Sequence, residues 1–119
     1  MGKIHVLLVD EEEELVSTMV RRLRLRGIEA EYVTSGEKAL ECITKRNFDF
    51  VVMDSSIPGM TGLDLMKKIR KINKEIKFIF FTGYGYYNKD LPEIKEGASE
   101  CLLKPVRIEA LIKRMEELA

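Results

Sequence analysis

Short apolar runs alternate with longer segments of helical periodicity along this chain. Residues 4–9 form a mostly aliphatic run, which is typical of a buried strand. Residues 12–26 follow with an apolar stripe at helical spacing, acids at the beginning and bases toward the end, and Gly27 comes directly after them. This order suits the helix dipole and a glycine stop, so it predicts a helix. Residues 28–33 alternate apolar and acidic side chains, which predicts a strand at a sheet edge.

The two patterns continue to alternate along the rest of the chain. After the favourable N-cap Ser35 they predict, in turn, a helix to about residue 46, strand 48–53, helix 63–72, strand 76–81, helix 91–96, strand 100–103 and helix 108–118. Five strand–helix units predict an α/β fold, with an open five-stranded parallel sheet and helices on both faces. A length of 119 residues predicts one domain, residues 1–119.

The amino-acid composition argues against some classes of binding partner and indicates a cellular location. Lys and Arg number 20 and Asp and Glu number 20, so the net charge of zero argues against binding nucleic acid or a membrane through bulk charge. No apolar run approaches the roughly 20 residues that span a bilayer. Two cysteines, Cys42 and Cys101, make no disulfide framework, and we therefore expect a cytoplasmic protein.

Polar residues follow four of the predicted strands. Asp10-Glu11 comes after the first strand, Asp54 after the third, Thr82 after the fourth and Lys104 after the fifth. In open parallel sheets, ligand sites lie beyond the carboxyl ends of the strands, so we expect these side chains to converge.

The converging side chains have complementary chemistry. Three carboxylates in a small site repel one another unless a hard cation such as Mg²⁺ lies among them. A lysine ammonium and a threonine hydroxyl suit a phosphoryl group, so the set predicts phosphoryl transfer through an aspartyl phosphate. Each residue alone has an ordinary interpretation as a helix cap or turn residue. The conjunction of four complementary strand ends is what favours a site.

These residues lie in strings that resemble the receiver domain of two-component response regulators, including the chemotaxis type. The strings are VLLVDEEEE, VVMDSSIPGMTGLDL, FFTGYG and CLLKP, in this order along nearly the whole chain. The resemblance implies a doubly wound, flavodoxin-like sheet with strand order 2-1-3-4-5. It also implies that Asp54 accepts a phosphoryl group from a phosphohistidine on a histidine kinase or a histidine phosphotransfer protein.

The resemblance assigns roles residue by residue. Glu11, Asp54 and the backbone carbonyl of Ser56 would hold Mg²⁺ directly, with Asp10 acting through water. Lys104 would pair with Asp54 or with its phosphoryl group. Thr82 would bond a phosphoryl oxygen and so move the face of helix four, strand five and helix five.

The resemblance implies that this face binds an output partner or an attached effector domain. It is also compatible with a homodimer of the chain. The chain would catalyse only its own phosphorylation and dephosphorylation, so it is not expected to be an enzyme. It holds no DNA-binding helix-turn-helix, and neither direct nucleic-acid binding nor membrane binding is expected. The Lys104-Pro105 bond resembles one that is usually cis in the family.

Some positions depart from the family pattern. Cys101 occupies the place of a usual Tyr or Phe, whose ring reports phosphorylation by swinging inward. We hypothesise that output relies instead on Thr82 and backbone movement, with Tyr84 or Tyr86 in place of the missing ring. The same departure keeps open a degenerate receiver that acts as a phosphorylation-independent docking module.

Two other classes fit less well. A haloacid-dehalogenase-type phosphatase needs a second Asp two positions after the nucleophile, where this chain has Ser56. A flavodoxin-like cofactor binder needs a phosphate-binding loop rich in Ser, Thr and Gly, whereas residues 10–14 are all acidic and repel anions.

Overall fold

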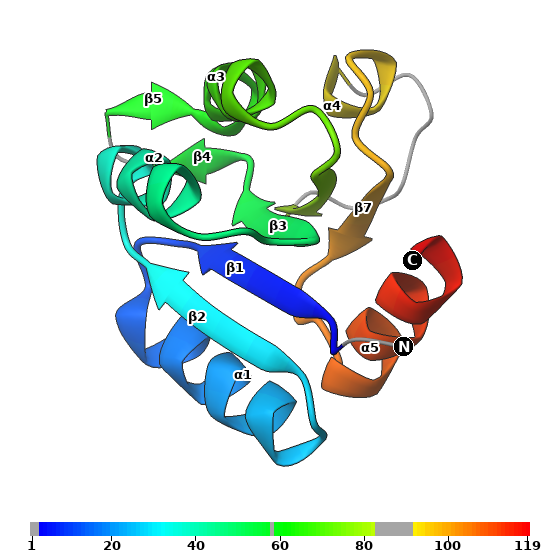
Figure 1. Ribbon diagram of the computed structural model, residues 1–119. Helices are drawn as coiled ribbons and strands as arrows, with labels where there is room; N and C mark the ends of the chain where they lie inside the picture. Colours follow the sequence, from blue (N-terminus) through cyan, green and yellow to red (C-terminus); the bar gives the residue numbers. More distant parts are fainter. Residues whose placement is uncertain (1–2, 58, 83–91) are drawn as a thin grey trace.

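The computed structural model describes residues 3–57, 59–82 and 92–119 (Figure 1). The strands are β1 (His5–Val9), β2 (Glu29–Val33), β3 (Phe50–Asp54), β4 (Ser56–Ile57), β5 (Met60–Thr61), β6 (Lys77–Thr82) and β7 (Glu100–Leu103). The helices are α1 (Glu13–Leu25), α2 (Gly36–Lys45), α3 (Gly62–Ile72), α4 (Pro92–Lys95) and α5 (Ile108–Leu118).

The main sheet has five strands in the order β2-β1-β3-β6-β7. All four pairings are parallel, as helical crossovers require. Counted without the two short strands, this is the order 2-1-3-4-5, so the predicted fold is confirmed. The alternating segment forms β2, and it lies at an edge of the sheet, as predicted.

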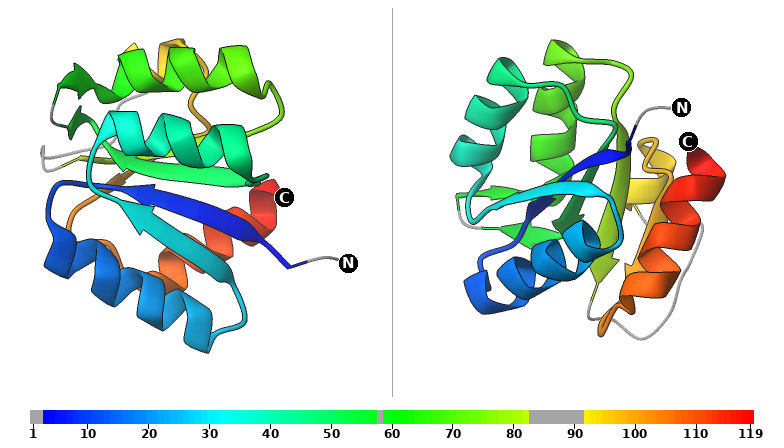
Figure 2. Two further views of the ribbon diagram at one scale, coloured as in Figure 1. Left: turned by 60° about the vertical axis from the view of Figure 1, so that its left-hand side comes forward. Right: turned by 60° about the horizontal axis from the view of Figure 1, so that its bottom comes forward.

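Helices cover both faces of the sheet (Figures 1 and 2): α2, α3 and α4 lie on one side, α1 and α5 on the other. Successive strand residues point to opposite faces, so each strand serves two cores. In β6, Phe78 and Phe80 pack on the α2–α3 side, while Ile79 and Phe81 pack on the α1–α5 side. Burying each such side chain contributes roughly 1.5–3 kcal/mol, which makes this interior strand a main source of stability.

Local signals start two of the helices. The Ser35 hydroxyl accepts a hydrogen bond from the Lys38 N–H at 3.3 Å at the start of α2, which confirms the expected N-cap. The Thr61 hydroxyl does the same for the Asp64 N–H at 3.0 Å at the start of α3. Each cap satisfies a backbone N–H that has no partner inside its helix.

Besides shifts of one or two residues at the ends of elements, the structure contains one pair of strands that the sequence did not predict. The segment after Asp54, expected to be a loop, contains the antiparallel pair β4 and β5, in which Ser56 faces Thr61 and Ile57 faces Met60. Strands of two residues are too short to show an alternating pattern. The expectations for Tyr84 and Tyr86 lie outside the described residues. Within residues 3–57, 59–82 and 92–119, no helix is long and apolar enough to cross a membrane.

Candidate functional site

The carboxyl edge of the sheet gathers the predicted site residues. Asp54 ends β3 and lies beside Phe81 of β6, and Thr82 ends β6 beside Leu103 of β7. The side chain of Thr82 lies outside what the structure describes, so only its backbone position at this edge is known.

Lys104 is the centre of the described site. Its Nζ atom lies 2.6 Å from Asp54 Oδ2 and 3.1 Å from Asp10 Oδ2. These partners are 50 and 94 residues away in the sequence, so only the parallel sheet brings them together. The predicted convergence of Asp10, Asp54 and Lys104 is therefore observed.

The contacts of Lys104 change its acidity. Burial lowers the pKa of the Lys104 ammonium, but hydrogen bonds to Asp54 and to Asp10, with the charges of both carboxylates, raise it more. The net result is a pKa above the ordinary value of 10.5, so Lys104 is a stable positive charge throughout the physiological range.

Asp10 is the buried anchor of the site, with 0% of its surface exposed. Its Oδ1 atom accepts a hydrogen bond from the Glu12 N–H at 2.9 Å, and its Oδ2 atom accepts one from Lys104. Both oxygens thus have partners, as a buried carboxylate requires. Asp54 is more open, with 22% of its side chain exposed, and so can meet an incoming group.

Gly62 lets α3 begin directly against Asp54. A Cβ atom at this position would lie 2.8 Å from the backbone oxygen of Asp54 and 2.7 Å from the ring of Phe80. The Gly62 N–H also donates to the Ser55 oxygen at 3.0 Å. The glycine of the GMTGLDL string therefore fixes the backbone around the predicted phosphoacceptor.

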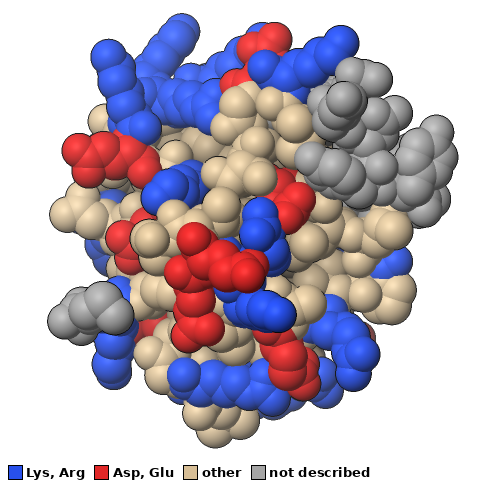
Figure 3. All heavy atoms as spheres, turned by 90° about the vertical axis from the view of Figure 1, so that its right-hand side faces the viewer, with Lys and Arg blue, Asp and Glu red and all other residues tan. Residues whose placement is uncertain are grey.

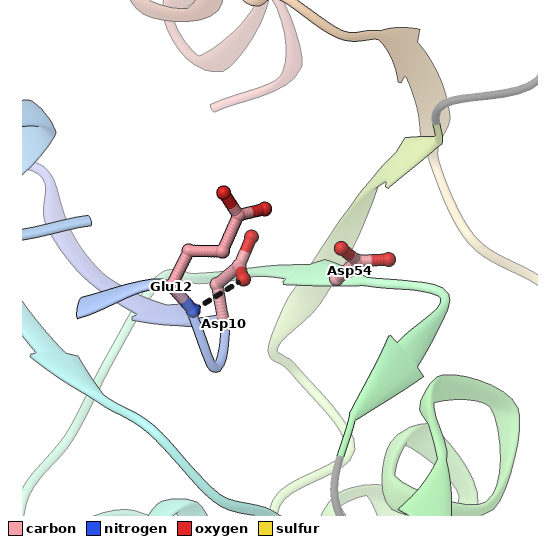
Figure 4. A group of neighbouring side chains, drawn as sticks. All are labelled: Asp10, Glu12 and Asp54. Carbon is pink, nitrogen blue, oxygen red and sulfur yellow. Dashed lines mark hydrogen bonds between the residues drawn. The ribbon is translucent and has the colours of Figure 1, made fainter. Parts of the chain in front are cut away.

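The acidic group differs from the predicted one in a single residue. Asp10, Glu12 and Asp54 each offer a carboxylate oxygen, and these oxygens all lie within 4.8 Å of one another (Figure 4). Glu11 is exposed and is not a member of this three-carboxylate group. The Asp10–Glu12 hydrogen bond sets the turn that brings Glu12 forward. Sequence analysis missed Glu12 because four successive glutamates look alike; the signal was an Asp two residues before it, able to accept its N–H.

A divalent cation fits this set of donors. Two like unit charges 4.8 Å apart repel by about 3 kcal/mol at an effective dielectric constant of about 20. Lys104 supplies one positive charge against three carboxylates, and its contact with Glu12 is longer, at 3.5 Å. Carboxylate oxygens are the ligands that Mg²⁺ prefers, so the chemistry of the donors matches the expected metal.

Two features that the sequence analysis singled out lie in β7 and directly after it. The Lys104-Pro105 peptide bond is cis, as the resemblance implied. Cys101 is 5% exposed, lies beside Phe80 in the sheet register and packs in the α2–α3 core. A small thiol thus occupies the position where the family usually has an aromatic ring.

Comparisons with known proteins agree with this geometry. The family model of the response regulator receiver domain matches residues 6–116. The crystal structure of the chemotaxis response regulator CheY4 of Vibrio cholerae is similar with a TM-score of 0.89 and 27% identity, covering 99% of this chain and 100% of CheY4. The response regulator TrrA of Thermotoga maritima, solved in complex with Mg(2+)-BeF, has a TM-score of 0.83 and 30% identity, covering 98% of this chain and 99% of TrrA.

The chain therefore belongs to the receiver domain family of two-component response regulators. Among curated relatives, the two-component response regulator PhoP of Pseudomonas aeruginosa is 29% identical over 113 residues, which are 95% of this chain and 50% of PhoP. The chain spans half or less of the length of the first curated relatives that it matches.

Proposed function

We propose that this chain accepts a phosphoryl group on Asp54 from a phosphohistidine of a histidine kinase or histidine phosphotransfer protein. The observation that carries the proposal is the 2.6 Å contact between Lys104 Nζ and Asp54 Oδ2 at the carboxyl edge of the sheet. Family membership supports the same role. A cytoplasmic location remains a prediction of this proposal.

The residues divide the work of transfer. A carboxylate oxygen of Asp54 attacks phosphorus, the P–N bond to the partner's imidazole breaks, and an O–P bond to Asp54 forms. Lys104, already directed at Asp54, stabilises the negative charge on the phosphoryl oxygens. Most of the catalysis is positioning and charge neutralisation, so the chain would take the phosphoryl group from its donor and modify only its own Asp54.

Mg²⁺ would be held directly by Glu11, Asp54 and the backbone carbonyl of Ser56, with Asp10 acting through water. When bound, it neutralises negative charge between the carboxylates and the phosphoryl oxygens. Ser56 opens β4, two residues beyond Asp54, and Glu11 directly follows Asp10 at the same edge. The metal-binding roles of all four residues are predictions of this proposal.

Output would pass through the face formed by α4, β7 and α5, with Thr82 as the residue that contacts the new phosphoryl group. Figure 3 shows this side of the molecule, where acidic and basic side chains are mixed. Arg114 of α5 contacts Glu100 of β7 at 2.6 Å, and Leu103 is 43% exposed nearby in sequence. An exposed leucine on this face suits a protein partner, an attached effector domain or a second copy of the chain.

The alternative function, a docking module that works without phosphorylation, is favoured by one residue, Cys101. Without an aromatic ring at this position, we expect the response to phosphorylation to depend on Thr82 and the backbone. Cys101→Tyr restores the usual ring and tests the native switch. A large gain in phosphorylation-dependent partner binding would show that the native switch is weak; unchanged binding would support our hypothesis.

Intact mass spectrometry after treatment with acetyl phosphate and Mg²⁺ tests the proposed function. We expect one phosphoryl adduct that is lost in Asp54→Asn and in the presence of a chelator. Absence of an adduct, both with acetyl phosphate and with phosphorylated kinases, would favour the docking module.

A further inference from the structure

Glu12 contributes a carboxylate to the site that the family resemblance does not assign. One of its oxygens lies within 4.8 Å of carboxylate oxygens of both Asp10 and Asp54, and its Oε1 atom lies 3.5 Å from Lys104 Nζ. Figure 4 shows Glu12 and Asp10 rising together from the turn after β1, with Asp54 across the site on β3. The position of Glu12 therefore raises the question of what a third carboxylate does here.

The backbone holds Glu12 in this position from both sides. Its N–H donates to Asp10 Oδ1 at 2.9 Å, and its carbonyl accepts the Val16 N–H at 3.1 Å at the start of α1. Glu13 and Glu14 lie in the first turn of α1, are exposed, and do not belong to the three-carboxylate group. Glu12 and Glu13 thus carry the same charge, but only Glu12 has a carboxylate oxygen close to those of Asp10 and Asp54.

The charge of the site explains what Glu12 can bind. Asp10, Glu12 and Asp54 carry three negative charges, and Lys104 balances one of them. The Glu12 side chain is 63% exposed, so its pair with Lys104 is solvated and contributes little to folding stability. An exposed carboxylate at the mouth of a negative site is suited to a hydrated cation, because Mg²⁺ usually keeps several of its waters in proteins.

We propose that Glu12 is a positioning residue for the divalent cation of this site and increases its affinity for Mg²⁺ through the waters of the ion. This inference rests on the cation of the proposed function, but not on the phosphoryl transfer itself. Removing one of three negative charges whose carboxylate oxygens lie within 4.8 Å of one another should weaken Mg²⁺ binding by about three- to tenfold after screening by water and salt.

The test is direct titration of the protein with MgCl₂ by isothermal titration calorimetry. Glu12→Gln keeps the size of the side chain and the backbone N–H while removing the charge, and Glu13→Gln makes the same change one residue away. We expect a Kd about three- to tenfold higher for Glu12→Gln and less than about twofold higher for Glu13→Gln. Glu12→Asp, which keeps the charge, should bind more tightly than Glu12→Gln.

Urea unfolding in a chelator controls for structure, and we expect the same midpoint for Glu12→Gln and Glu13→Gln. Equal Mg²⁺ affinities of these two variants would overturn the inference. Failure of the wild-type chain to bind Mg²⁺ would overturn it together with the metal part of the proposed function. Normal Mg²⁺ binding without any phosphoryl adduct would instead overturn the proposed transfer and leave the role of Glu12 standing.

Discussion

Lys104 joins the ends of three strands through its contacts with two carboxylates. Asp10 follows β1 and is fully buried, while Asp54 ends β3 and is partly open. Lys104 therefore connects these strand ends, and in the proposed function it is also the charge that stabilises the phosphoryl oxygens. Removing the Lys104 charge should therefore lower the stability of the fold and also slow phosphorylation.

Lys104→Met keeps the length of the apolar stem and removes the charge. We expect the free energy of unfolding to fall by about 1–3 kcal/mol, because buried Asp10 is left without its ion-pair partner. Urea denaturation measures this loss, with Lys113→Met on the exposed face of α5 as the control. Equal stability of the two variants would contradict the structural role of Lys104.

The raised pKa of Lys104 also gives this contribution a pH dependence. A lysine whose pKa is higher in the folded state stabilises the fold fully below its ordinary pKa of 10.5 and loses this contribution as pH rises above it. The stability difference between wild type and Lys104→Met should thus stay constant near about pH 8 and shrink toward about pH 11. A difference that shrinks below pH 9 would contradict this assignment.

At the scale of residues, strand ends were enough to predict Asp10, Asp54 and Lys104. Each is a polar residue directly after an apolar run, so its position depends only on where the strand stops. Glu12 was not predicted, because its position depends on a turn set by one hydrogen bond from its N–H to Asp10. Glu11 and Glu12 have the same chemistry in the sequence, and only the turn distinguishes them.

Among the elements, the start of α3 matters most to the site, because Gly62 touches the backbone of Asp54. Gly62→Ala should lower stability by about 1–3 kcal/mol and slow phosphorylation, since the added Cβ would meet the Asp54 oxygen and the Phe80 ring. Gly36→Ala is the matched control at the first residue of α2, where the atoms nearest to the added Cβ belong to the flexible side chain of Met60. Urea unfolding and adduct formation measure the two effects, and an equal or larger loss in Gly36→Ala would contradict the account.

Arg70 connects α3 to the end of α4. Its guanidinium donates to the backbone oxygens of Glu96 and Gly97 and lies 5.3 Å from the centre of the Phe78 ring. We expect Arg70→Ala to increase amide hydrogen exchange around residues 94–99 by about tenfold, because roughly 1–2 kcal/mol of local contacts is lost. Lys71→Ala, on the exposed side of the same helix, should leave that exchange unchanged. If the two variants exchange alike, Arg70 does not hold α4.

The main elements could be predicted because each helix buries one apolar stripe, whereas the interior strands are short apolar runs buried on both faces. The strand predicted over 100–103 and the helix predicted over 108–118 agree with β7 and α5 residue for residue. The predicted ends of β3 and β6 were one residue too early, because Asp54 and Thr82 are polar although their backbones continue the ladder. The short β4–β5 pair could not be predicted from apolar periodicity.

For the molecule as a whole, the net charge of zero conceals a sorted distribution. Negative charge gathers at the carboxyl edge of the sheet, where three carboxylates face one lysine. A cation that binds there stabilises the folded state alone, because the unfolded chain does not hold these groups together.

Mg²⁺ should therefore raise the thermal unfolding midpoint. We expect about 1.4 kcal/mol of added stability at a free concentration of about ten times Kd, and a smaller gain in Asp54→Asn. Differential scanning fluorimetry checks this, with NaCl at the same ionic strength as the control for screening. If NaCl stabilises as much as MgCl₂, the carboxylates do not form a specific cation site.

The most direct test of the central claim is to locate the phosphoryl group itself. Reduction with borohydride converts an aspartyl phosphate to homoserine, and peptide mass spectrometry then identifies the modified residue. After treatment with acetyl phosphate and Mg²⁺, we predict homoserine at position 54 and unmodified Asp10. Modification at another carboxylate, with position 54 unchanged, would contradict the assignment of Asp54 as the phosphoacceptor.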